Sequence, residues 1–167
     1  MTIILRSMMQ ISAALVAALL IAGCGHSPEV IRAAPRPQPA VSADDHLAEG
    51  VSLFRSGHLD RAEGHLSTAL AHDPSNWTAH YYLGLVLAAA DDLATASVEL
   101  HQALDLAPSD GRTRSRIYYA LGQVNEQLGR NGKARLAYLT ALNLWPNSHS
   151  ARTAMRRLDD RLLRTDK

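Results

Sequence analysis

The single cysteine of the chain, Cys24, is the first candidate for chemistry. It is the only cysteine among 167 residues and lies in the stretch LLIAGCGHS, Leu19 to Ser27. A lone thiol cannot form a disulfide within the chain. It can act as a catalytic nucleophile, a small core residue, a dimerising group or an attachment point. The residues around it decide between these roles.

The segment in front of Cys24 is apolar and short. Arg6 is its only charged residue, and residues 8–22 are apolar apart from two polar positions. A run of this length falls below the roughly 20 residues that a membrane-spanning helix needs. A positive start, a short apolar run and small residues at the end are typical of a secretory signal peptide. We therefore predict a signal peptide over residues 1–23, with a buried core helix as the alternative.

The end of this segment, Ile21-Ala22-Gly23-Cys24, resembles the bacterial lipobox: an aliphatic residue, two small residues and a cysteine. The resemblance implies that the Cys24 thiol receives a diacylglyceryl group, that the peptide before it is removed and that the new amino terminus is acylated. Several acyl chains give stable membrane anchoring. Gly25 follows where aspartate would favour retention in the inner membrane. The resemblance therefore implies a lipid anchor in the outer membrane, with the chain on the periplasmic face.

The eight histidines are the other candidates for chemistry, and three of them, His58, His65 and His72, are spaced by seven residues. A zinc site needs ligands that converge, but His58 falls in an expected turn and His72 at an expected helix end. The sequence lacks a nucleophile elbow, a P-loop and a His-Glu-x-x-His motif. We predict no enzyme activity, no cofactor and no metal; a hydrolase or a histidine-metal enzyme is the rival hypothesis. A net charge of +1 also gives no support for nucleic-acid binding.

A proline-rich segment follows Cys24. Residues 25–42 contain four of the seven prolines and show no hydrophobic periodicity. Prolines at 35, 37 and 39 favour the extended polyproline II conformation, which makes a semi-rigid spacer. We predict that residues 24–42 are a lipidated cysteine and a tether, with a disordered tail that has no function as the alternative.

The other three prolines mark an internal repeat. Pro74, Pro108 and Pro146 each follow an Ala-Leu pair and are spaced by 34 and then 38 residues. Aligned on proline, each repeat has small residues at three positions and one large residue: Gly50, Gly84 and Gly122; Ala62, Ala96 and Ala134; Leu66, Leu100 and Tyr138; Ala69, Ala103 and Ala141. The third repeat carries four extra residues around 111–114.

This pattern resembles the tetratricopeptide repeat, a helix-turn-helix unit of about 34 residues. Leu83-Gly84 and Leu121-Gly122 match its first helix, whereas Glu49 and Asn125 stand where large apolar residues are usual. An aromatic content of only 5% also favours helices over a β-sandwich. The resemblance implies an all-α fold, a right-handed solenoid of three repeats plus a capping helix. Their expected bounds are 43–76, 77–110 and 115–148 for the repeats and 149–167 for the cap and tail.

The expected cap has an apolar stripe at helical spacing. Ala151, Met155, Leu158 and Leu162 are separated by four, three and four residues, with charges elsewhere. Such an amphipathic helix is predicted to cover the third repeat. Its basic excess leaves contact with anionic lipid or nucleic acid as the alternative.

In the tetratricopeptide family the first helices line a concave groove that holds a peptide or helix. The matching positions here are Leu47, Val51, Phe54, Tyr81, Leu85, Ala88, Ala89, Arg116, Tyr119, Gln123, Glu126 and Gln127. The lysines and asparagines by which one variant of the family clamps a carboxy terminus are missing. We therefore expect an apolar strand or amphipathic helix as ligand, with exposed Tyr81 and Tyr119 as anchors. The alternative is that some of these side chains pack between repeats.

Together these features predict a protein-binding scaffold anchored in the outer membrane. Among lipoproteins of this build, it is similar to those that serve tight-adherence (Flp) or type IV pilus biogenesis and assist a secretin. This similarity implies a secretin or pilus-assembly component as partner. An adaptor for peptidoglycan-remodelling enzymes and a homo-oligomer whose groove is filled by a neighbouring copy are the alternatives.

Overall fold

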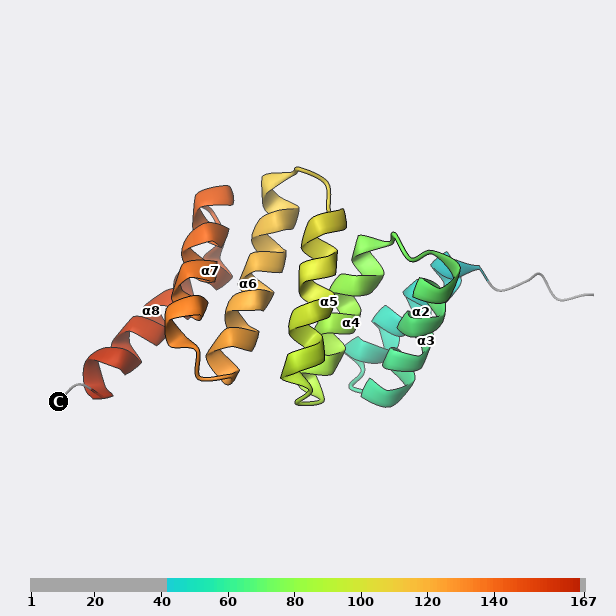
Figure 1. Ribbon diagram of the computed structural model, residues 1–167, viewed down its shortest axis with the longest axis horizontal. Helices are drawn as coiled ribbons and strands as arrows, with labels where there is room; N and C mark the ends of the chain where they lie inside the picture. Colours follow the sequence, from blue (N-terminus) through green and yellow to red (C-terminus); the bar gives the residue numbers. More distant parts are fainter. Residues whose placement is uncertain (1–41, 166–167) are drawn as a thin grey trace, which may run out of the picture. The chain divides into compact units, whose positions relative to one another are not determined.

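The computed structural model describes residues 42–165, and every regular element among them is an α-helix (Figure 1). The predicted signal peptide, Cys24 and nearly all of the predicted tether lie outside the described residues. The helices are α2 (Ala43–Arg55), α3 (Leu59–His72), α4 (Trp77–Ala89), α5 (Leu93–Leu106), α6 (Gly111–Gln127), α7 (Asn131–Leu144) and α8 (His149–Thr165). Among residues 42–165 no helix has both the length and the apolar character to cross a membrane.

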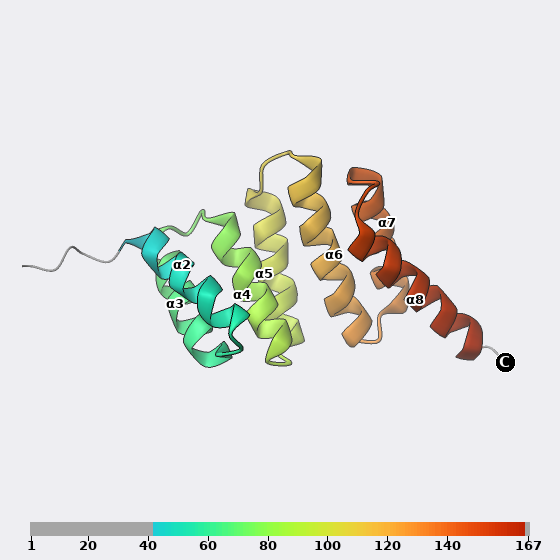
Figure 2. The same ribbon diagram turned by 180° about the vertical axis from the view of Figure 1, so that it is seen from behind.

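The first six helices form three pairs, and α8 follows as a single helix. The pairs α2 with α3, α4 with α5, and α6 with α7 pack side by side along the chain, and α8 packs on α7 (Figures 1 and 2). This arrangement confirms the predicted fold class of three helix-turn-helix repeats with a capping helix.

Short polar residues cap the starts of α4, α6 and α8. The side chain of Asn76 accepts hydrogen bonds from the backbone amides of Thr78 and Ala79, and Asp110 caps α6 in the same way. Ser148 accepts a weaker bond from the Ala151 amide at the start of α8. Each of these caps lies two residues after a repeat proline, so one local signal starts α4, α6 and α8.

The turns inside the repeats also share one conformation. Gly57, Asp91 and Gly129 occupy equivalent positions and all have positive φ angles, of 81°, 68° and 69°. Glycine adopts this left-handed conformation without steric cost, whereas a residue with a side chain adopts it less readily. The central repeat therefore makes the same turn with a less suitable residue.

Within each pair, a glycine of the first helix faces the large residue of the second. A Cβ atom added to Gly50 would lie 2.7 Å from Leu66 Cγ, and one added to Gly84 would lie 2.7 Å from Leu100 Cγ. In the third pair the side chain facing Gly122 is the ring of Tyr138. All six residues are buried. The glycines therefore make room for the side chains that fill each pair.

The four extra residues of the third repeat extend its first helix. Residues 111–114 form the first turn of α6, which has 17 residues where α2 and α4 have 13. A Cβ atom on Gly111 would lie 2.7 Å from the carbonyl oxygen of Leu144, at the end of α7. The buried Ser115 hydroxyl donates a hydrogen bond of 2.8 Å to the Ala141 carbonyl. The longer helix thus follows α7 to its end.

The capping helix buries the predicted stripe. Ala154 and Leu158 form a buried cluster with Ala134 and Tyr138 of α7, and Met155 and Leu162 pack against it. Outside this cluster, Arg135 Nε lies 2.9 Å from Asp159 Oδ1. The apolar stripe of α8 therefore covers the third repeat as predicted.

The glycine contacts generate a test of stability. Gly84→Ala places a methyl group against Leu100, and overpacking of this kind costs about 1–3 kcal/mol. Gly64→Ala is the matched control, because Gly64 lies inside α3 with open space around its added Cβ, and alanine there is expected to stabilise the helix by about 1 kcal/mol. Urea unfolding followed by circular dichroism measures both. Equal changes in the two variants would contradict the proposed role of Gly84.

Candidate functional site

The first helices of the three repeats together line a hollow of about 210 Å³. Its walls combine apolar side chains of α2 and α4 with both apolar and amide side chains of α6. The lining residues are Phe54, Leu85, Ala88, Ala89, Ala120, Gln123, Val124 and Gln127. Half of the predicted groove residues are therefore brought together in one concave site.

The other predicted groove residues do not line this hollow. Leu47 packs against the main apolar core, and Val51 is half-buried outside the hollow. Arg116 is exposed and stands over the ring of Tyr81, with 5.4 Å between its guanidinium carbon and the ring centroid. Tyr119 is half-buried, and its ring centroid lies 5.9 Å from that of Tyr138.

The expected exposure of Tyr81 is wrong. Its side chain is only 8% exposed and belongs to the core. The ring centroid of Tyr82 lies 5.2 Å away, and Arg116 of the next repeat covers it from another side. Burial raises the pKa of Tyr81, although the nearby Arg116 charge opposes this shift. Tyr81 is therefore a packing residue between the second and third repeats.

Sequence reasoning missed two apolar residues of the site, Ala120 and Val124. Both are almost fully buried, and they form the α6 part of the hollow. Ala120 and Val124 lie one helical turn apart on α6. Ala120 stands three residues before Gln123, and Val124 stands three residues before Gln127. That spacing was the signal that could have found them.

A second, polar hollow of about 160 Å³ adjoins the first. It is lined by Gln123, Glu126 and Gln127 of α6 and by Arg157 and Arg161 of α8. The two hollows share Gln123 and Gln127, so they form one groove that is apolar at one end and charged at the other. The arginines were missed as groove residues because the basic excess of residues 149–164 was assigned to a solvated face.

Glu126 organises the charged end of the groove. The Tyr138 hydroxyl donates to Glu126 Oε2 at 2.7 Å, Arg157 Nη2 lies 3.3 Å from the same oxygen, and Arg161 pairs with Oε1. Burial opposes ionisation of Glu126, whose side chain is 10% exposed, but the Tyr138 hydrogen bond and the two arginines outweigh it, so its pKa lies below the usual value. Burial and the bond to Glu126 raise the pKa of Tyr138, which keeps its hydroxyl a donor.

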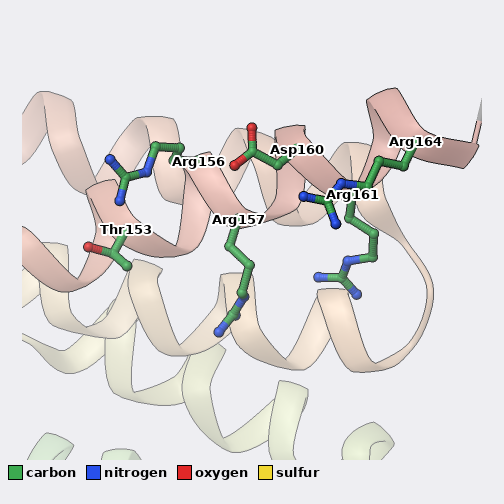
Figure 3. A pocket seen from close by; sticks show the side chains of 6 residues that line it. All are labelled: Thr153, Arg156, Arg157, Asp160, Arg161 and Arg164. Atoms are coloured by element: carbon green, nitrogen blue, oxygen red, sulfur yellow. The ribbon is translucent and has the colours of Figure 1, made fainter.

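The two arginines point toward α6, as Figure 3 shows. Arg156, Arg164 and Asp160 of the same helix, together with Thr153, line a shallow surface of α8. This surface has three more positive than negative charges once Arg157 and Arg161 are included, so it is cationic. Glu126 partly neutralises the side that borders the groove.

Two of the histidines with sevenfold spacing, His65 and His72, each lie near His46. His46 Nδ1 is 3.2 Å from His65 Nδ1, and the ring of His72 stacks on that of His46 at 6.1 Å between centroids. His58 is an exposed turn residue. Within residues 42–165 no three histidine, cysteine or carboxylate side chains are arranged to hold a metal ion.

The Glu126 network generates a pH-dependent prediction. Glu126→Gln should destabilise the chain by about 1–2 kcal/mol at neutral pH, because hydrogen bonds to charged groups are the stronger ones. Since the folded-state pKa is lowered, this stabilisation is present above about pH 4.3, the unfolded value, and is lost as pH falls through the folded pKa. The gap between parent and variant should therefore close in acid.

Denaturant unfolding at pH 7 and at successively lower pH measures this gap. Glu63→Gln, on the exposed surface of α3, is the control and should differ little from the parent at any pH. A gap for Glu126→Gln that stays constant down to pH 3 would show that the carboxylate charge has no role in the network.

Comparisons with known proteins agree with the helical architecture. Residues 47–111 match the tetratricopeptide repeat family. The first tetratricopeptide domain of Spaghetti (RPAP3), solved bound to the HSP90 peptide SRMEEVD, is 21% identical and superposes with a TM-score of 0.66, covering 73% of this chain and 94% of that one. MamA 41-end from Desulfovibrio magneticus RS-1 is 23% identical with a TM-score of 0.65, covering 73% and 67%.

One curated relative also matches. The Hsp70-Hsp90 organizing protein of Triticum aestivum is 27% identical over 113 residues, which are 68% of this chain and 19% of that protein. This chain thus spans about a fifth of that relative's length. The sequence match over residues 47–111, the shared helical architecture and the repeated glycine contacts agree: residues 42–165 have the fold of a tetratricopeptide repeat solenoid.

Proposed function

We propose that the chain is a scaffold that binds a segment of another protein in the groove formed by α2, α4 and α6. The observation that carries this proposal is the continuity of the two hollows along α6. The apolar hollow accepts large apolar side chains, and the glutamines between the hollows offer hydrogen bonds to a backbone. Such a combination of apolar pockets and a few placed polar groups is how peptide grooves obtain affinity and specificity.

The groove favours an apolar segment over an acidic one. Phe54, Leu85 and Ala88 present apolar surface, while Arg157 and Arg161 are already engaged by Glu126. An acidic ligand would have to compete with a partly buried carboxylate for these arginines. The RPAP3 domain, bound to an HSP90 peptide, supports peptide binding by this fold, but the chemistry here differs from a site for the acidic sequence SRMEEVD. We infer an amphipathic helix or apolar strand as ligand.

We further propose that the scaffold is held at the outer membrane by lipid on Cys24, on the periplasmic face. The support is the Ile21-Ala22-Gly23-Cys24 motif after a short apolar segment. Similarity to lipoproteins of pilus biogenesis makes a secretin or a pilus-assembly component the first candidate partner. An adaptor for peptidoglycan-remodelling enzymes is the alternative, and identification of the cross-linked partner described below separates the two.

A photo-crosslinking amino acid in place of Gln127, which is exposed in the groove, should capture the partner in cells. The same amino acid in place of Gln102, exposed on α5, is the control on the other side of the repeats and should not capture it. Ala88→Arg keeps a good helix former but fills the groove with a large side chain. We expect this variant to bind the partner about tenfold more weakly, a loss of about 1.4 kcal/mol of binding free energy. Capture from both positions, or binding unchanged by Ala88→Arg, would rule out the groove.

Cys24→Ser should abolish lipid attachment. The serine hydroxyl cannot form the thioether, so the chain should remain an unprocessed precursor that takes up no labelled palmitate. Gel mobility and fluorography measure both properties. Palmitate uptake or normal processing of Cys24→Ser would disprove the lipoprotein proposal and leave the groove proposal standing.

A further inference from the structure

A third hollow lies beside the third repeat and shares no lining residue with the two hollows of the groove. It has a volume of about 520 Å³. The helices α5 and α7 lie on either side of it, with α6 between them, and it includes Ser97 and His101 of α5, Tyr118 and Asn125 of α6, and Leu136 and Ala137 of α7. We call it the α5–α7 site.

The α5–α7 site lies where the third repeat departs from the second. In the second repeat, His80 Nδ1 lies 2.7 Å from Glu99 Oε2, which joins α4 to α5. The equivalent residues in the third repeat, 38 positions later, are Tyr118 and Ala137. The methyl group of Ala137 cannot reach across, so the space that Glu99 fills in the second repeat stays open in the third.

A second replacement widens the same space. Leu87 of the second repeat is buried in the core, and its equivalent in the third repeat is Asn125. Asn125 Nδ2 turns back to its own helix and donates to the Leu121 carbonyl at 2.8 Å. The departure from the repeat pattern at position 125 therefore places a polar amide at a hollow where the preceding repeat has a leucine.

The lining combines apolar surface with positive charge. Leu136 is 66% exposed, and Leu121 and the Tyr118 ring also line the site. Arg130 and Lys133 also line the site, and its lining contains no carboxylate. An occupant with an apolar body and an anionic head would cover Leu136 and place its charge beside the two cations.

We propose that the α5–α7 site binds a small amphiphile with an anionic head, such as an aliphatic carboxylate. A volume of about 520 Å³ falls within the range of small-molecule sites, and the apolar lining with a few polar groups is typical of them. Residues of three helices line the site, and its cationic residues, Arg130 and Lys133, give it a charge that the apolar hollow of the groove lacks. This proposal is independent of the peptide groove, because Ser97, Tyr118 and Ala137 contribute nothing to the groove.

Protection of a single thiol tests the site directly. The full chain carrying Cys24→Ser and Ser97→Cys has its only thiol in the α5–α7 site, and the probe is decanoate. At a decanoate concentration near four times the Kd, about four-fifths of the sites are occupied, so alkylation of the thiol should slow about fivefold. Binding elsewhere on the chain does not alter this readout.

Matched variants make the test specific. Glu63→Cys puts a thiol at the equivalent position of α3 and should show no protection. Tyr118→His with Ala137→Glu copies the pair of the second repeat, fills the site and should abolish protection at position 97. Arg130→Gln with Lys133→Gln should weaken it severalfold while circular dichroism stays unchanged.

Three outcomes would overturn the proposal. Absence of protection at position 97 would show that the site binds no such ligand, and equal protection at position 63 would show nonspecific association. Equal protection by decan-1-ol and decanoate would show that the cations do not recognise an anionic head. None of these outcomes bears on the groove, whose own cross-linking test remains separate.

Discussion

The close contact between one glycine and one large side chain is the constraint on which each helix pair depends. Gly84 lets Leu100 fill the space between α4 and α5, and the same relation holds in the other two pairs. Because the three pairs then have nearly the same geometry, they stack in register and bring their first helices together. The groove is a consequence of this repeated packing, since its lining comes from α2, α4 and α6.

The third repeat uses the same contact for an additional purpose. Its large residue is Tyr138, which fills the space beside Gly122 and reaches Glu126 with its hydroxyl. Glu126 in turn holds Arg157 and Arg161 of the capping helix. One tyrosine therefore supports the core packing, the attachment of the cap and the charge at the end of the groove. A leucine at the same position would provide only the packing.

The fold was predictable because its signals are local and repeated. Prolines and small residues at matching positions indicated three helix pairs, and the spacing of Leu158 and its neighbours indicated the cap. The site was only partly predictable, because Tyr81 is covered by Arg116 of the next repeat and by Tyr82, contacts that periodicity does not show. The groove role of Arg157 was missed for the same reason, since its partner Glu126 lies 31 residues away. The lipid anchor on Cys24 stays a prediction.

The start of α8 follows the repeat pattern only in part. After Pro146 and the Ser148 cap, α8 begins as the first helix of another repeat would. Ten residues after Pro146, however, the chain has Arg156, where the second repeat has Gly84 ten residues after Pro74. An exposed arginine therefore stands where the three helix pairs have the glycine that admits the large residue of the second helix. The capping helix thus starts as a repeat does and departs from the repeat at the residue on which close pairing of two helices depends.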